Sequence, residues 1–152
     1  MDAAKFFLPR EVDEVDLKPW ASLLPTSAKP LRTNLFGDTF LLDGAGAVHM
    51  LERAGCSCQQ VAPSEETFWH ELSEDPEGWL LGSLVEECRG ADKTLATGQC
   101  YAFSTPPILG GDYSAENIWV APWRDWFAFT EQIFQKIKDL PDGTAVTIEI
   151  ED

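Results

Sequence analysis

Histidine and cysteine are the residue types best suited to nucleophilic or metal chemistry, and their spacing here favours neither. The two histidines are His49 and His70. His49 falls within a predicted strand. His70 lies four residues before Glu74 on a predicted helix, where the two side chains would share one face as a surface ion pair. A zinc site would need a second histidine within reach of His70, and the sequence supplies none.

The four cysteines show no spacing typical of a disulfide framework or a metal site. They are Cys56, Cys58, Cys88 and Cys100. The N-terminal stretch has no basic region followed by an apolar run, so we expect no signal peptide, a cytoplasmic location and reduced, mostly buried thiols. Cys100 with His49 is the one Cys–His combination on strands predicted to be neighbours, and nothing around Cys100 indicates an activated thiol. The sequence therefore predicts no catalytic residue, no metal and no cofactor.

Acidic residues dominate the charge of the chain and are concentrated in its middle. The 152 residues include 11 Lys and Arg against 26 Asp and Glu, a formal net charge of −15. The densest stretch, 64–92, holds nine acidic residues opposed by Arg89 alone. A field of this sign repels nucleic acid and anionic membranes, and it accelerates encounter with a cationic partner. We therefore expect no nucleic acid or membrane partner.

The acidic stretch has two interpretations, a solvated helix face that keeps the protein soluble or a docking face for a basic protein. In the second case exposed carboxylates and two less constrained aromatic residues would carry the contacts. The candidate partner-binding residues are Glu65, Glu66, Glu71, Glu74, Asp75, Glu77, Glu86, Glu87, Tyr113 and Trp119. Acids are so abundant that a catalytic carboxylate pair can always be imagined, and a hydrolase is the weakest hypothesis.

The elements that position these residues indicate an α+β fold: a mostly antiparallel sheet, beginning as a meander, with packed helices in a single domain. Residues 1–30 are predicted to form an arm with one short helix, and residues 31–152 the main domain. Strands are expected in 31–36, 39–43, 47–51 and 57–61, and later in 99–103, 117–120 and 145–150. Gly37 and Gly44 are expected in tight turns, and Gly110-Gly111 in a loop conformation closed to residues with side chains.

Three helical segments are predicted. Ser64 is a candidate cap for the first helix, with Glu65 and Glu66 in its first turn. A second helix restarts at 75–77 and ends at Gly90. The third and longest spans about 122–138. Four tryptophans fit the core faces of these helices, namely Trp69, Trp79, Trp123 and Trp126, whereas Trp20 is less constrained.

Several motifs occur in an order that resembles one family. They are Asn34–Leu41 (NLFGDTFL), Gly46–Leu51 (GAVHML), Gly98–Tyr101 (GQCY), Pro106–Tyr113 (PPILGGDY), Glu116–Ile118 (ENI), Gln132-Ile133 and Lys138–Gly143 (KDLPDG). Together they resemble the C-terminal domain of Tdi-type immunity proteins of type VI secretion, a domain often found after a GAD-like domain. The resemblance covers roughly residues 20–146.

The resemblance implies a non-enzymatic, intracellular α+β domain that binds and neutralises a cognate effector toxin, with a DNase as the expected class. The family defines no catalytic residues, so none is assigned here. The acidic surface would then occlude the active-site region of a basic nuclease domain. The alternative is an intracellular scaffold or regulatory domain for a non-toxin partner, with loop 105–113 as its groove. The oligomeric state stays open.

Overall fold

The computed structural model describes residues 6–8, 14–75 and 77–139, and its antiparallel sheets and packed helices confirm the predicted α+β class. The predicted turn at 141–143 and the strand at 145–150 lie outside the described residues. No helix of the described residues is long and apolar enough to cross a membrane.

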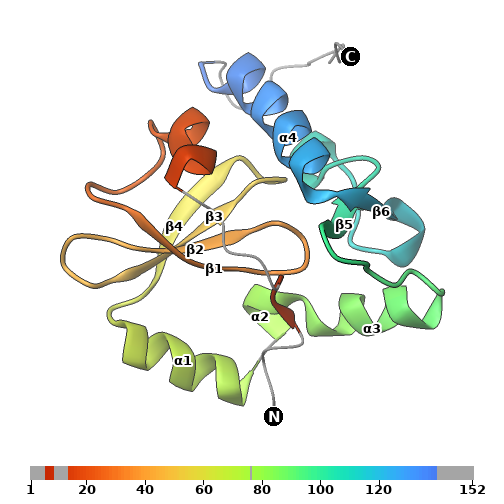
Figure 1. Ribbon diagram of the computed structural model, residues 1–152, viewed down its shortest axis with the longest axis horizontal. Coiled ribbons are helices and arrows are strands. Elements are labelled where there is room, and N and C mark those ends of the chain that lie inside the picture. The colour runs from red at the N-terminus through yellow and green to blue at the C-terminus, as the bar shows by residue number, and fades with distance from the viewer. Residues whose placement is uncertain (1–5, 9–13, 76, 140–152) are drawn as a thin grey trace.

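Four strands form an antiparallel meander in the order of the chain (Figure 1). They are β1 (Lys29–Thr33), β2 (Thr39–Leu42), β3 (Val48–Glu52) and β4 (Ser57–Ala62). Phe40 pairs with Met50, and Leu42 with Val48, so the apolar residues at period two meet across the β2–β3 pair. This sheet is the one predicted from the hairpin signals.

The hairpin between β2 and β3 differs from the prediction in which glycine makes the turn. Gly46 has φ +88°, whereas Gly44 is not in the left-handed region. The Asp43 carboxylate accepts hydrogen bonds from the N–H groups of Ala45 and Ala47. Because this Asx-type turn holds residues 43–45, the residue with left-handed backbone conformation is Gly46 and not Gly44. Gly37, at φ +85°, occupies a tight turn as predicted.

The second sheet consists of β5 (Gln99–Phe103) and β6 (Ile118–Pro122), again antiparallel. Helix α4 (Trp123–Ile137) follows β6 directly and packs against both strands (Figure 1). Its buried face comprises Trp123, Trp126, Phe127, Thr130, Ile133 and Phe134. The 3-10 helix η2 (Glu14–Trp20) packs against α4, and the Trp20 ring stacks on Phe134 with centroids 4.7 Å apart. Trp20 is fully buried and is therefore a core residue, although the sequence pattern did not indicate this.

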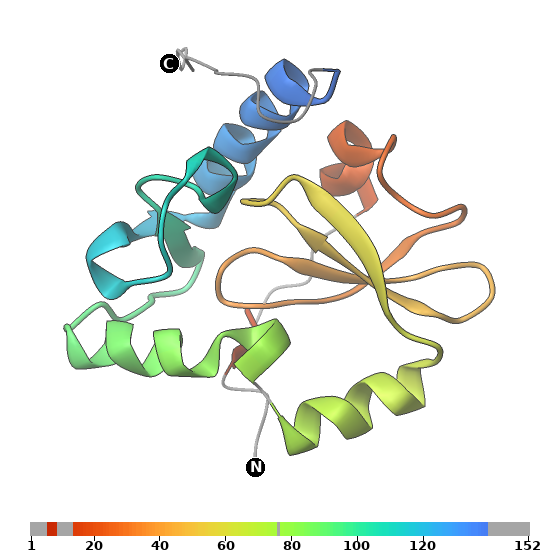
Figure 2. The same ribbon diagram turned by 180° about the vertical axis from the view of Figure 1, so that it is seen from behind.

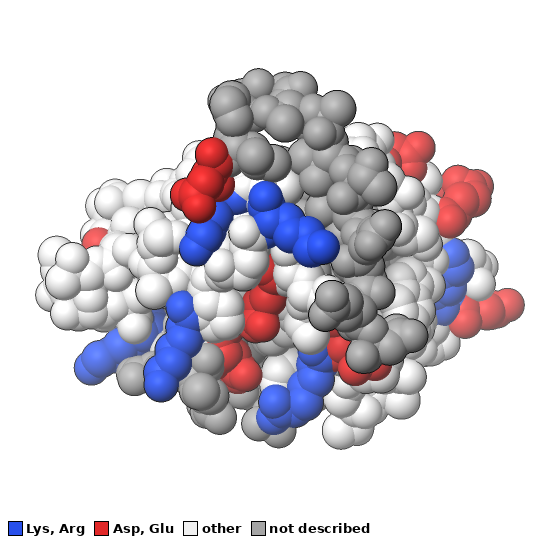
Figure 3. All heavy atoms as spheres, turned by 90° about the horizontal axis from the view of Figure 1, so that it is seen from above, with Lys and Arg blue, Asp and Glu red and all other residues white. Residues whose placement is uncertain are grey.

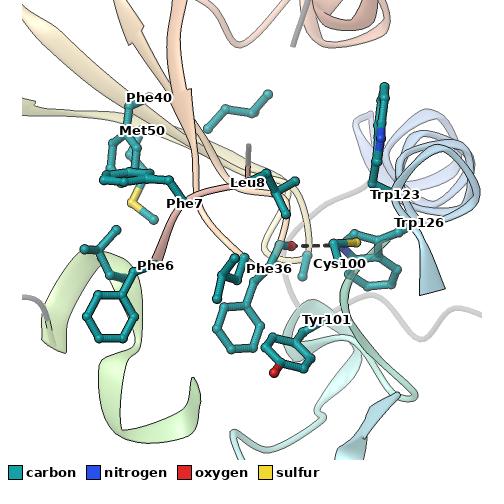
Figure 4. Packing of buried hydrophobic residues seen from close by; sticks show 14 of the residues in the cluster. Phe6, Phe7, Leu8, Phe36, Phe40, Met50, Cys100, Tyr101, Trp123 and Trp126 are labelled. Carbon is teal, nitrogen blue, oxygen red and sulfur yellow. Dashed lines mark hydrogen bonds between the residues drawn. The ribbon is translucent and has the colours of Figure 1, made fainter. Parts of the chain in front are cut away.

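The turn that joins β1 to β2 connects the two sheets. The Leu35 carbonyl accepts from the Tyr101 N–H, and the Phe36 carbonyl accepts from Trp126 Nε1 at 3.0 Å. The N-terminal residues 6–8 lie along this turn, where the Phe6 carbonyl accepts from the Leu35 N–H. Figure 4 shows Phe7 beside Phe40 and Met50 of the first sheet, with Leu8 farther toward Phe36, Cys100 and Trp126.

Three helices run along one side of the molecule, at the opposite end from η2 (Figures 1 and 2). They are α1 (Glu65–Glu74), α2 (Glu77–Leu80) and α3 (Gly82–Gly90). The sequence predicted one continuous helix from 75–77 to Gly90, and the structure corrects this to two. Leu81 separates them in the left-handed region, at φ 52°. Leu80, Val85 and Cys88 are fully buried, and packing on both sides of the break outweighs local helix propensity.

Candidate functional site

The glutamates of helix α1 face solvent because the helix has a defined N-terminal cap and buries one apolar face. Ser64 caps the helix, with its Oγ accepting from the Thr67 N–H at 3.1 Å, as predicted. Phe68 and Leu72 are fully buried. The opposite side of the helix therefore faces solvent and carries the glutamates.

The link between α1 and α2 is built around Asp75. Its N–H donates to the Glu71 carbonyl at 2.9 Å and closes the last turn of α1. Its carboxylate Oδ1 accepts from the Glu77 N–H at 3.0 Å and so supports the start of α2. Asp75 thus has a structural role in addition to its charge.

All eight acidic residues predicted for partner binding in this region are exposed. We define the acidic face as these residues of α1, the link and α2–α3: Glu65, Glu66, Glu71, Glu74, Asp75, Glu77, Glu86 and Glu87. Arg89 is the single Lys or Arg in residues 65–90. The end of the molecule that carries η2 differs, because Lys and Arg side chains lie among acidic ones there (Figure 3). The negative charge is therefore segregated by position in the fold.

Three members of the acidic face surround a hollow of about 360 Å³. Glu71, Glu74 and Asp75 line it together with Trp79 of α2. Trp79 was predicted as a core residue, but it is half-buried, with its ring stacked on Phe68 at 5.5 Å. An aromatic wall among carboxylates can receive a cationic side chain by combining charge and cation–π attraction.

Part of the acidic face is paired or hydrogen-bonded within the chain. Glu74 Oε1 lies 3.3 Å from His70 Nε2, which confirms the predicted pair, and Glu86 pairs with Arg89 at 3.2 Å. Three other carboxylates accept hydrogen bonds, and their donors are Trp69 Nε1 for Glu65, Ser83 Oγ for Glu77 and the Ala115 N–H for Glu87. Within the described residues, the carboxylates of Glu66 and Glu71 have no ion pair or hydrogen bond.

The two aromatic candidates are exposed but belong to other elements. Trp119 lies on β6 with 48% of its side chain exposed. Tyr113, 56% exposed, ends the loop after β5 and packs edge-on against Phe103. The structure places neither in the hollow formed by Glu71, Glu74, Asp75 and Trp79.

Loop 105–113 is closed on itself by Asn117. The Asn117 side chain accepts from the Thr105 N–H and donates to the carbonyls of Thr105 and Asp112. A Cβ at Gly111 would lie 1.6 Å from the Thr105 carbonyl oxygen, and Gly110 has φ +95°. The prediction that these two glycines are required by the loop is consistent with this geometry.

In the described part of the chain, the histidines and cysteines do not form a catalytic or metal-binding arrangement. Cys100 and His49 lie in different sheets, and His49 Nε2 instead contacts Asp43 Oδ2 at 2.8 Å. Burial raises the pKa of Cys56 and Cys58 to about 11 and that of Cys100 to about 12. No group of three or more His, Cys, Asp or Glu among the described residues could hold a metal ion.

Sequence reasoning missed two features of these surfaces. The first is the hollow beside half-buried Trp79, in front of a helix break at Leu81 that no local sequence signal marks. The second is a pocket between the two sheets, lined by Asp38, Glu52 and Tyr113. These three residues are far apart in the chain, so only the fold brings them together.

Comparison with protein families shows that residues 65–134 match the family described as T6SS immunity protein Tdi1, C-terminal. A search of curated proteins gave no match. The matched stretch begins at α1 and ends within α4, so it includes the whole acidic face, loop 105–113 and the second sheet. Over residues 65–134 the match confirms the resemblance drawn from the sequence motifs, whereas the motifs at 34–41, 46–51 and 138–143 lie outside it.

Proposed function

We propose that this protein, whose residues 65–134 carry a type VI secretion immunity domain, neutralises a cognate DNase effector by covering its nucleic-acid-binding cleft with the acidic face. The observation that carries the proposal is the segregation of charge: eight exposed acids and one basic residue over α1–α3. A nuclease holds its substrate through cationic side chains that contact phosphates. A rigid array of carboxylates offers those same side chains an alternative partner.

Binding in this way requires charge that the chain has not already used. Glu66 and Glu71 meet that condition best, because their carboxylates have no partner among the described residues. The hollow beside Trp79 adds area that can be desolvated around a basic side chain. Long-range attraction would accelerate encounter, and the buried contacts would slow dissociation.

The proposal describes inhibition by occlusion and assigns no reaction to the immunity protein itself. Raised thiol pKa values make the cysteines poor nucleophiles at neutral pH. The two histidines are both in contact with carboxylates on the surface or at a hairpin. The toxin is therefore expected to be bound intact.

The test begins with a search of the genes next to this one for a reading frame that ends in a nuclease domain. Bacteria expressing its nuclease domain alone should lose viability and chromosomal DNA, and co-expression of this protein should restore both. The tagged protein should also recover the toxin domain from the same cells. Survival without physical recovery, or recovery with no protection, would contradict neutralisation by direct binding.

A further inference from the structure

A small pocket lies between the first sheet and β5, away from the hollow of the acidic face. It has a volume of about 110 Å³ and its lining includes Asp38, Met50, Glu52, Leu81, Phe103 and Tyr113. The lining comes from the turn before β2, from β3 and the turn after it, from the α2–α3 break, from the end of β5 and from the last residue of loop 105–113. A cavity of this size accommodates the end of one side chain rather than a helix or a nucleotide.

Two carboxyl groups line the pocket, and none of the described residues in its lining is basic. Asp38 accepts from the Arg53 backbone N–H at 3.1 Å and from Asn34 Nδ2 at 3.4 Å. The Arg53 guanidinium itself points elsewhere: its Nε donates to the Gly37 carbonyl and its Cζ lies 3.7 Å from the Phe127 ring centroid. Within the described residues the Glu52 carboxylate has no ion pair or hydrogen bond. Glu52 therefore gives the pocket a carboxylate without a partner among the described residues, whereas Asp38 is held by the Arg53 N–H and by Asn34.

Tyr113 gives the pocket an exposed aromatic wall that is held in place. Its ring packs edge-on against Phe103 with centroids 5.4 Å apart, while 56% of the side chain stays exposed. Asn117 closes the loop behind it, and the Ile108 N–H donates to the Ala54 carbonyl next to the pocket. A rigid exposed tyrosine loses little conformational entropy on binding, which is the property of a contact hot spot.

We propose that this pocket receives one arginine side chain of the effector, between the ring of Tyr113 and the carboxylates of Glu52 and Asp38. Arginine fits better than lysine because its planar guanidinium stacks on an aromatic ring and donates several hydrogen bonds in a fixed plane. The inference rests on the proposed function and deepens it. The acidic face would attract the toxin by charge, and this pocket would select it by shape.

Protonation of Asp38 gives the site a pH dependence. Burial, and secondarily Glu52, raise the pKa of Asp38 to about 7, against opposing effects of the Arg53 N–H and charge and of Asn34. The other titratable groups near it are Tyr113 and Cys100, and their own pKa values are raised mainly by burial. A guanidinium favours the ionised carboxylate, so binding releases a proton below about pH 7 and arginine affinity should rise from pH 6 to pH 8.

The first test uses a small probe and the whole protein. Nα-acetyl-arginine methylamide is titrated against the isotope-labelled protein by NMR, with the neutral isostere Nα-acetyl-citrulline methylamide as control. Saturable shifts in the millimolar range should centre on Glu52, Phe103 and Tyr113, and Tyr113→Ala or Glu52→Gln should abolish them. Glu116→Gln, which neutralises an exposed carboxylate that does not line the pocket, should leave them unchanged. Binding of the citrulline probe with equal affinity, or tighter binding of Nα-acetyl-lysine methylamide, would overturn the proposal.

The second test measures the toxin domain itself. Tyr113→Ala and Glu52→Gln should each raise the dissociation rate at least tenfold with little change in the association rate. If wild type binds the toxin and both variants bind equally well, the pocket is not a contact and the proposed function stands. If the wild-type protein does not bind the toxin, the proposed function fails. The NMR titration with the arginine probe then shows by itself whether the pocket binds a guanidinium.

Discussion

The turn at residues 34–38 and the acidic face both carry polar side chains, but these side chains lie in opposite environments. Asn34 is fully buried and uses its side chain four times: Oδ1 accepts from the N–H groups of Phe36 and Asp38, and Nδ2 donates to Asp38 and to the Trp79 carbonyl. Glu66 and Glu71 are exposed and make no such bond among the described residues. Polar side chains thus serve the fold in one region and remain available in the other.

This difference indicates how the chain divides its functions. A buried polar network is costly unless every member is paired, so the residues of the turn tolerate little change. Exposed charges far from such networks contribute little to stability, so they can vary with the partner. We therefore expect the turn to be required for folding and the acidic face to determine which toxin is bound.

The largest expected effect comes from Asn34→Ala. The substitution leaves the N–H groups of Phe36 and Asp38 buried without an acceptor and removes the link to Trp79. The free energy of unfolding should fall by about 3 kcal/mol or more, measured by urea denaturation. Glu71→Ala should change it by less than about 0.5 kcal/mol. Similar losses from the two variants would abolish the contrast between the regions.

Two glycines in the family-matched stretch offer a second contrast. Gly111→Ala places a Cβ against the Thr105 carbonyl, so loop 105–113 must move at a cost of about 2 kcal/mol, within the usual range for overpacking. Gly90→Ala meets no atom within 4 Å and should be neutral or stabilising by up to about 1 kcal/mol. Thermal unfolding of both variants checks the order. A Gly111→Ala protein as stable as wild type would show that the loop is adaptable.

The pH dependence of stability should report the burial of Asp38. Its pKa is raised from 3.8 to about 7, so between these values the folded state holds a proton that the unfolded state has released. Stability should therefore fall as pH rises through this window, by about 1.4 kcal/mol per pH unit at most from this group. In Asp38→Asn the Arg53 N–H keeps an acceptor and this dependence disappears. Parallel stability–pH curves for the two proteins would contradict the assignment.

The sequence allowed most local structure to be predicted and little of the tertiary arrangement. Hairpin signals at Gly37-Asp38 and 43–46 and the cap at Ser64 are local, so the meander and α1 followed from them. The break at Leu81 and the burial of Trp20 depend on packing between distant segments, and neither was anticipated. For the site, the exposure of the acids could be predicted from their density, but their grouping around Trp79 could not.

The central claim is that the acidic face provides the electrostatic attraction for the toxin, and two matched double variants test it most directly. The first double variant, Glu66→Lys with Glu71→Lys, alters the acidic face. The second, Asp125→Lys with Asp139→Lys, makes the same charge change on and just after α4. Each pair includes one acid from the first turn of a helix. Affinity for the toxin domain would be measured at low and at physiological salt. The account predicts that the first pair lowers affinity at least tenfold, mainly through the association rate and with weaker salt dependence, while the second pair changes it much less. Equal losses from both pairs, or none from the first, would contradict it.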